Sequence, residues 1–307
     1  MELAELLKET PIVIDGSMST PLEIWGAQTD SDLWTAAALI NHPDLVKRVH
    51  QAYFEAGARI TITDSYQTNV AAFEKHGYGE QAARRLIRLS AQLAQTARDE
   101  YEKATGVHNL VAGSIGPYGA YLADGSEYRG DYELSLADYQ DFHAPRLEEL
   151  LAAGVDCLAI ETQPKLAEVT AILAWLHDHQ ISVPVWVSFS LQDPQTISEG
   201  TALTQAVEAI QDDLNVLAVG VNCMPVTMAT PAVETIAKVA SVPIIVYPNS
   251  GAQYDPITKT WQTTTGQTSF AQAAVDWVQA GAGIIGGCCT TMPKDIQEIK
   301  LAIAKES

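Results

Sequence analysis

The sequence has few basic side chains and few cysteines, and each shortage excludes a class of protein. Its 307 residues include 18 lysines and arginines against 38 aspartates and glutamates, so the formal net charge is −20. A surface this acidic repels phosphate groups, so we expect neither nucleic acids nor anionic membranes as partners. Four cysteines are too few for the disulfide framework of a small secreted domain.

Targeting and membrane-spanning patterns are also missing. Residues 1–5 read MELAE, with no basic segment followed by an apolar stretch, so we expect no secretory signal. The longest apolar runs are interrupted by Asn222, Pro225 or Pro243, and none reaches the ~20 residues of a membrane helix. We therefore expect a cytoplasmic protein with reduced thiols. No linker rich in glycine, serine or proline divides the chain, which predicts one domain over residues 1–307.

Short apolar runs alternate with amphipathic stretches of helical periodicity along the chain. The runs are nearly continuous in hydrophobicity, which is typical of parallel strands buried on both faces. Eight runs are found, at Ile12–Asp15, Arg59–Asp64, Leu110–Gly113, Cys157–Glu161, Val183–Phe189, Val216–Asn222, Ile244–Tyr247 and Gly283–Gly286. Eight strand–helix units predict an α/β fold of the (β/α)8 TIM barrel type. A doubly wound open sheet is the alternative, because alternation alone does not distinguish the two.

Three of the stretches between strands predict helices clearly, at Pro43–Ala56, Gln81–Tyr101 and Leu136–Ala153. An Ala-Gly pair ends the first and the third of these, and glycine after a helix suits a left-handed cap. Between residues 118 and 134 we expect a long loop, and loops of this length are commonly functional.

Three of the four cysteines follow predicted strands, at the end where a TIM barrel carries its active site. Cys223 follows the sixth strand, and Cys288 and Cys289 follow the eighth. Three thiolates at one rim suit a soft metal ion, and three ligands leave the open position of a catalytic zinc site. Gly286 and Gly287 allow the backbone to leave strand geometry, so that both neighbouring sulfurs face one ion. A pair of buried small residues and an oxidised pair are the alternatives for Cys288 and Cys289.

Such a site suits sulfur chemistry better than hydrolysis. Three thiolates give a divalent ion a net negative environment, which makes it a poor Lewis acid for water. A substrate thiol bound in the fourth position loses its proton and stays nucleophilic, because thiolate is the reactive form of sulfur. The cysteine pattern therefore predicts transfer of an alkyl group to a thiol.

Several short strings resemble one known family, the homocysteine S-methyltransferases. They are GGCC at 286–289, VNC at 221–223 and YPNSG at 247–251. The string GSIGPYGAYLADGSEYRGDY at 113–132 is similar to the S-methylmethionine-using branch of that family. The resemblance runs from Ile12 to about Leu301 and implies a zinc-dependent barrel that methylates L-homocysteine to methionine. By this resemblance the zinc ligands are the three strand-end cysteines.

The resemblance also implies residues that hold homocysteine. Glu161 ends the fourth strand at the position that binds the homocysteine amino group in the family. Asp15 and Gly16 match the family's first motif, which lines the homocysteine pocket. Asn222 precedes a metal ligand, and we expect it to orient that ligand.

The methyl donor is expected to be a cationic sulfonium, and aromatic faces attract such cations. Trp34 matches a family tryptophan near the donor, and Tyr66 follows the second strand. S-methylmethionine is the expected donor, with S-adenosylmethionine as its main competitor. Two other functions stay open: a metal-independent barrel lyase or isomerase with Glu161 or Asp64 as base, and a non-catalytic zinc-binding protein.

Overall fold

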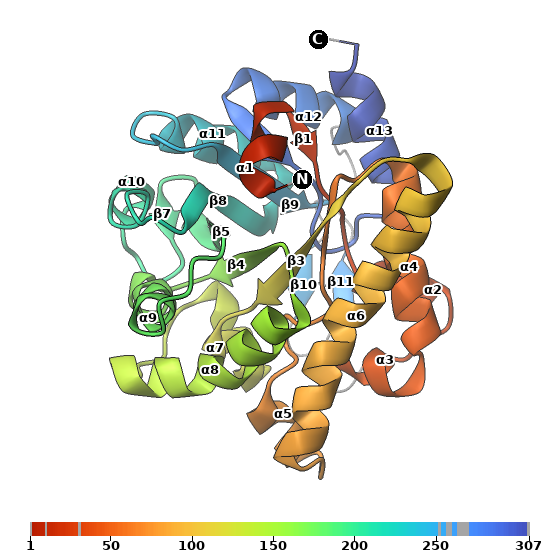
Figure 1. Cartoon of the computed structure of the whole chain (residues 1–307). Helices are drawn as coiled ribbons and strands as arrows, with labels where there is room; N and C mark the ends of the chain where they lie inside the picture. The colour runs from red at the N-terminus through yellow and green to blue at the C-terminus, as the bar shows by residue number, and fades with distance from the viewer. Residues whose placement is uncertain are drawn as a thin grey trace.

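A computed structural model describes residues 2–9, 11–29, 32–250, 253–255, 260–262 and 270–305. Eight parallel strands form its central sheet, and helices surround them (Figure 1). In chain order these are β1 (Ile12–Val13), β2 (Ile60–Ile62), β3 (Leu110–Ile115), β4 (Cys157–Gln163), β5 (Val185–Phe189), β8 (Val216–Pro225), β9 (Ile244–Asn249) and β12 (Ala282–Ile285). All eight predicted strands are confirmed, with boundaries that differ by a few residues.

The sheet closes on itself. Its strands lie in the order β1-β12-β9-β8-β5-β4-β3-β2, and Ile14 forms a parallel bridge with Ile60 that joins the two ends. The amide of Arg59 donates to the carbonyl of Val13 at 2.8 Å, and that of Asp15 donates to Ile60 at 3.1 Å. These bonds occupy backbone groups that an open edge leaves unpaired. The predicted TIM barrel is confirmed, and the open doubly wound sheet is excluded.

Alternate residues of each strand face the inside of the barrel or the surrounding helices. Along β4, Cys157 and Ala159 lie in the interior cluster, whereas Leu158 and Ile160 pack under the helices. The helix α1 (Leu3–Leu6) adds both of its leucines to the interior cluster. The strands are therefore apolar on both faces, which is why they read as continuous apolar runs in the sequence.

Helices cover the outside of the barrel (Figure 1). They are α2 (Ser19–Ile24), α3 (Ala36–Asn41), α4 (Pro43–Ala56), α5 (Val70–Lys75), α6 (Glu80–Thr105), α8 (Leu136–Ala153), α9 (Leu166–Asp178), α10 (Leu203–Glu208), α11 (Val226–Ile236), α12 (Phe270–Gln279) and α13 (Pro293–Ile303), with the short 3-10 helix η1 (Leu7–Glu9) after α1. The predicted bounds of α4 and α8 are confirmed to the residue. Gly57 and Gly154 cap these two helices at φ of 104° and 75°, where a side chain is strained.

The segment between residues 118 and 134 is more ordered than the predicted long loop. It contains the helix α7 (Tyr118–Leu122) and the 3-10 helix η2 (Ser126–Tyr128). Tyr132 and Tyr139 form a buried cluster with Ala171, and residues of α7 pack against it. Gly119 permits this packing, because a Cβ there would lie 2.7 Å from the Glu127 amide nitrogen. Aromatic packing therefore fixes the segment against α8 and α9, and the loop prediction is wrong over these helices.

Two antiparallel hairpins were not predicted. They pair β6 (Leu191–Asp193) with β7 (Thr196–Ile197), and β10 (Gln253–Asp255) with β11 (Thr260–Gln262). Each follows a barrel strand on its C-terminal side. No helix in the described part of the chain is long and apolar enough to cross a membrane.

Candidate active site

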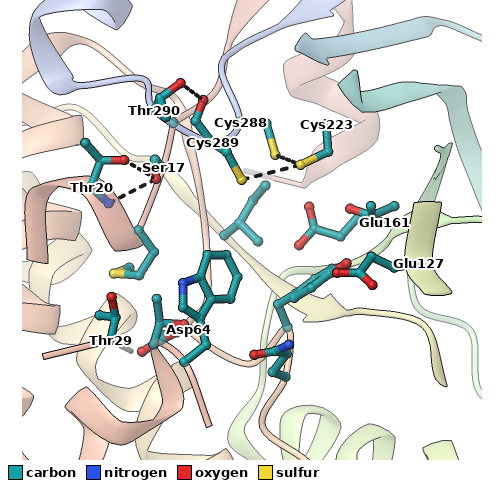
Figure 2. Close-up of a pocket in the computed structure, with 18 of the residues that line it drawn as sticks. Ser17, Thr20, Thr29, Asp64, Glu127, Glu161, Cys223, Cys288, Cys289 and Thr290 are labelled. Carbon is teal, nitrogen blue, oxygen red and sulfur yellow. Dashed lines mark hydrogen bonds between the residues drawn. The ribbon is translucent and has the colours of Figure 1, made fainter. Parts of the chain in front are cut away.

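A cavity of about 590 Å³ lies at the C-terminal ends of the barrel strands. It is lined by residues of the loops after β1, β2 and β12, by residues near the ends of β4, β8 and β9, and by two residues of η2 (Figure 2). The lining residues include Gly16, Trp34, Asp64, Tyr66, Glu127, Tyr128, Glu161, Cys223, Tyr247, Cys288 and Cys289. The cavity thus occupies the place where a TIM barrel carries its active site.

Cys223, Cys288 and Cys289 converge at one side of this cavity (Figure 2). The Sγ atoms of Cys223 and Cys288 are 2.8 Å apart, those of Cys223 and Cys289 are 3.5 Å apart, and all three lie within 4.8 Å of one another. No disulfide joins them. Tetrahedral zinc with Zn–S bonds of ~2.3 Å separates its sulfurs by about 3.8 Å. The three soft donors therefore fit one thiophilic ion after shifts on the order of 1 Å.

The glycines before the cysteine pair serve close packing. A Cβ on Gly286 would lie 2.8 Å from the Asp15 carbonyl oxygen, and one on Gly287 would lie 2.7 Å from the Thr291 Cβ. Neither glycine has a positive φ; Cys223 instead carries the left-handed backbone, with φ of 56°. The sequence predicted that these glycines let the backbone leave strand geometry. In the structure, their missing side chains let the chain pack closely against the end of β1 and the loop after β12.

Hydrogen bonds within the cluster shift the pKa values of the three thiols in different directions. Donation from Cys288 and Cys289 lowers the pKa of Cys223, and the Tyr128 hydroxyl, 3.4 Å from its sulfur, adds to this effect. The bonds to Cys223 raise the pKa of Cys288 and Cys289. The cluster therefore concentrates negative charge at Cys223, and thiolate is the form that binds a metal.

Glu161 lies at the end of β4 with its carboxyl in the cavity. It accepts hydrogen bonds from the hydroxyls of Ser114 and Tyr247 and forms no ion pair with a described side chain. Burial raises the pKa of Glu161 to about 7. A desolvated carboxyl held by two hydroxyls is suited to a cationic group of a ligand.

Asp15 and Gly16 are neighbours in the chain, but only Gly16 reaches the cavity. Gly16 lines the cavity, but the Asp15 carboxyl turns toward β2 and is not among the lining groups. Its Oδ2 atom accepts from the Thr61 hydroxyl at 2.8 Å and from the Ile62 amide at 2.7 Å. Burial raises the pKa of Asp15 to about 8. These contacts join β1 to β2, and the structure does not bring the Asp15 carboxyl to the cavity.

The Asn222 side chain forms its hydrogen bonds with residues of β4 and β5, and none with a cysteine sulfur. Its Oδ1 atom accepts from the Thr162 amide at 2.8 Å and from the Ser188 hydroxyl at 2.9 Å. Its Nδ2 atom donates to the Thr162 hydroxyl at 2.8 Å. Thr162 has φ of 56°, so these bonds hold a strained residue next to Glu161. Asn222 therefore orients the end of β4, and the amide of Asn249 instead bonds the Cys223 carbonyl at 3.1 Å.

Trp34 and Tyr66 are brought together as a pair of rings on the cavity wall. Their centroids are 6.2 Å apart and their planes meet at 78°. Trp34 has φ of 46°, which is uncommon for a residue with a bulky side chain. The tight turn thus places an indole beside a phenol, and both rings can offer a face to a cation.

Sequence reasoning missed Tyr128 and Glu127, which η2 brings to the cysteines. Ninety-five residues separate Tyr128 from Cys223, so no local pattern reports their contact. Their only signal is the string GSEYRGDY, which lies in the segment expected to be a loop. Burial raises the pKa of Glu127 to about 7.

The cavity wall is acidic. Five carboxyl groups line it, from Glu23, Asp32, Asp64, Glu127 and Glu161. Among the described residues, no lysine, arginine or histidine lines it. Since low-dielectric walls focus a field of one sign, the cavity attracts cations and disfavours phosphate or purely anionic ligands.

Comparison with known proteins assigns the chain to a family. The family model described as homocysteine S-methyltransferase matches residues 12–303. The chain belongs to the homocysteine S-methyltransferase family. A homocysteine S-methyltransferase of Bacillus subtilis (strain 168) is 45% identical over 293 residues, which cover 94% of this chain and 93% of that protein. One of Escherichia coli (strain K12) is 42% identical over 300 residues, covering 97% and 96%.

Solved structures agree with this assignment. The metallated form of the homocysteine methyltransferase MmuM from Escherichia coli matches with a TM-score of 0.88 and 40% identity, covering 97% of this chain and 98% of that one. The family resemblance and the enzyme prediction are confirmed: the chain is a homocysteine S-methyltransferase with a metal site. A metal-independent lyase and a non-catalytic binding protein are thereby set aside.

Proposed function

We propose that this homocysteine S-methyltransferase uses zinc and takes its methyl group from S-methylmethionine. The observation that carries the proposal is one cavity that joins three cysteine sulfurs to an acidic, aromatic wall. Cys223, Cys288 and Cys289 would hold the ion. Bound there, Zn²⁺ would supply a Lewis acid that lowers the pKa of the homocysteine thiol.

Glu161 would bind the α-ammonium group of L-homocysteine. Its hydroxyl partners, Ser114 and Tyr247, fix the carboxyl while leaving it without a cation. Gly16 also lines the cavity, whereas Asp15 supports the strands next to it through its hydrogen bond with Thr61. This arrangement directs the thiol of homocysteine to the side of the cavity where the cysteine sulfurs lie.

The donor would lie against the rings of Trp34 and Tyr66. Cation–π attraction favours a sulfonium there, and the carboxyl groups of the wall favour a donor with net positive charge. S-methylmethionine and S-adenosylmethionine both meet these requirements. The similarity of residues 113–132 to the S-methylmethionine-using branch favours the first.

The transfer is a direct displacement. The homocysteine sulfur forms a bond to the donor's methyl carbon as the bond from that carbon to the sulfonium sulfur breaks. The electron pair of the broken bond stays on the donor sulfur and cancels its positive charge, and the thiol proton is released. Two methionines result. Because opposite charges disappear, positioning by the cavity contributes more than stabilisation of either charge alone.

We further propose that residues 1–307 form a single homocysteine-binding domain. The match of the family model to residues 12–303 supports this proposal. The four cysteines are free, and the three in the cavity must stay reduced to bind an ion. A reducing compartment such as the cytoplasm suits that requirement.

The test is methionine formation from L-homocysteine and S-methylmethionine under reducing conditions. Activity should disappear when the metal is chelated and return when zinc is added. Cys288→Ser should lower both the bound metal and the rate by more than tenfold, which corresponds to about 1.4 kcal/mol or more. Cys157→Ala is the matched control, because Cys157 is buried in the barrel interior and does not line the cavity. Full activity after metal removal, or metal retention without activity for any donor, would contradict the proposal.

A further inference from the structure

Asp64 is a buried carboxyl of the cavity with no role in the proposed mechanism. It follows β2 and is only 3% exposed, yet its side chain lines the cavity. The Thr35 side chain gives it one hydrogen bond, and its Oδ2 atom has no partner among the described residues. Leaving a carboxyl oxygen unpaired in a buried place costs free energy unless a ligand supplies the missing donor.

The position of Asp64 separates it from the groups that receive homocysteine. Figure 2 shows Asp64 at the end of the cavity away from the three cysteines, whereas Glu161 lies on the cysteine side. One ammonium group bound at Glu161 therefore leaves Asp64 without a cation. No described lysine, arginine or histidine lines the cavity to neutralise it.

Asp64 is also linked to the Trp34 side of the aromatic pair. Thr35, its hydrogen-bond partner, follows Trp34 in the chain, and Tyr66 lies two residues after Asp64. The two ring centroids are 6.2 Å apart. A sulfonium at the Trp34 ring would therefore have the Asp64 carboxyl on its side of the cavity, away from the cysteines.

We propose that the Asp64 carboxylate receives the α-ammonium group of the methyl donor and so selects sulfonium amino acids over sulfonium compounds without an amine. The proposal rests on the proposed function, since it concerns the donor of that reaction. Both reactants are amino acids, and the cavity offers each ammonium its own carboxyl: Glu161 for the acceptor and Asp64 for the donor. A charge-assisted hydrogen bond of this kind fixes orientation as well as charge.

The experiment compares two donors on the metal-loaded enzyme with saturating L-homocysteine. S-methylmethionine carries the amine, and 3-dimethylsulfoniopropionate is a sulfonium carboxylate without it. Asp64→Asn should lower kcat/KM for S-methylmethionine by about 10- to 100-fold. It should change kcat/KM for the amine-free donor by less than about threefold. Asp64→Glu, which keeps the charge, should recover part of the lost activity with S-methylmethionine.

The matched control is Glu23→Gln, which removes another carboxyl of the same cavity at an exposed position. It should affect both donors by the same factor, since it changes only the general charge of the wall. Calorimetric titration of each donor into the wild type and Asp64→Asn gives the same comparison without turnover.

The outcomes are distinct. An equal loss for both donors in Asp64→Asn, or no loss for either, would overturn the role of Asp64 while leaving the proposed function intact. A wild type that binds S-methylmethionine no better than the amine-free donor would also overturn it. Failure of the wild type to form methionine from S-methylmethionine would instead remove the proposed function, and this inference with it.

Discussion

Glu161 shows how the environment of a single residue prepares a binding group. A carboxyl at the end of β4 is taken out of water, and burial raises its pKa to about 7. The hydroxyls of Ser114 and Tyr247 hold it without supplying a positive charge. A ligand ammonium would provide that charge and favour the ionised form of the carboxyl.

Replacement of Glu161 by glutamine tests this role. Glu161→Gln keeps the shape of the side chain but removes its charge, so the KM for L-homocysteine should rise by about 10- to 100-fold. The KM for the methyl donor should change by less than about threefold, because the donor uses other groups of the wall. Initial rates give the two KM values separately when the concentration of each substrate is varied in turn. Equal increases in both KM values would contradict the assignment.

The sequence predicted which residues lie at the cavity where the end of a strand alone determines their location. Glu161 and Cys223 lie near the ends of their strands and Cys288 and Cys289 follow theirs, and strand ends of a barrel meet at one rim. Asp15 follows a strand too, but its carboxyl turned to the Ile62 amide at 2.7 Å, away from the cavity. Side-chain direction after the last strand residue depends on neighbouring backbone donors, and the sequence does not report these.

At the scale of elements, α8 and α9 meet in a buried polar network behind the cavity. Arg146 of α8 donates to the carbonyls of Tyr66 and Gly116 at 2.6 Å each, and to His143 Nδ1 at 2.9 Å. The other ring nitrogen of His143 lies 2.8 Å from the Glu168 carboxylate of α9. Since Arg146 occupies Nδ1, the proton of neutral His143 is on Nε2 and faces Glu168.

The same network fixes the segment after β3. Glu168 accepts hydrogen bonds from the Tyr118 amide at 2.6 Å and from the Tyr132 hydroxyl at 2.5 Å. These two contacts lie before and after η2, which carries Glu127 and Tyr128 into the cavity. Helical periodicity predicted α8 to the residue, but it does not show that its buried face is partly charged. The order of residues 118–134 therefore follows from contacts that a local pattern does not contain.

Removal of Arg146 should be costly. Arg146→Met leaves the carbonyls of Tyr66 and Gly116 and the Nδ1 atom of His143 without their shared donor, so the free energy of unfolding should fall by about 3 kcal/mol. Urea denaturation monitored by circular dichroism measures the change. Arg85→Met is the control, because Arg85 lies exposed on α6 and its loss should change stability by less than ~0.5 kcal/mol. Equal stability of the two variants would contradict a structural role for the network.

At the scale of the whole molecule, barrel closure assembles the site. Sixty-five residues separate Cys223 from Cys288, and they meet because β8, β9 and β12 are neighbours in the sheet. The count of eight strands predicted this closure, and with it the convergence of the cysteines. The depth of the cavity and the acidity of its wall depend on side-chain packing between loops, so they were not predictable in the same way.

The buried carboxyl groups of the cavity also make the free energy of unfolding depend on pH. The contribution of Asp64 to this dependence can be measured separately. Burial raises the pKa of Asp64 from 3.8 to about 6. Between these values the folded protein keeps a proton that the unfolded chain has released. The unfolded chain binds fewer protons in this window, so the free energy of unfolding falls as pH rises through it. This direction is opposite to that of a carboxyl stabilised by an ion pair.

Asp64→Asn removes that titration and should change the pH profile of stability. From about pH 5 to about pH 7.5 the wild type should lose about 1 kcal/mol of unfolding free energy relative to the variant. Urea denaturation of both proteins without substrate, at several pH values in this range, measures the difference. The comparison uses only how the difference in unfolding free energy between the two proteins changes with pH. A constant gain or loss of stability caused by the substitution therefore does not affect the result. Parallel profiles would contradict a raised pKa of Asp64 in the empty cavity. Added S-methylmethionine should reduce the pH dependence of the difference in this range, since an ammonium at Asp64 favours its ionised form and lowers its pKa.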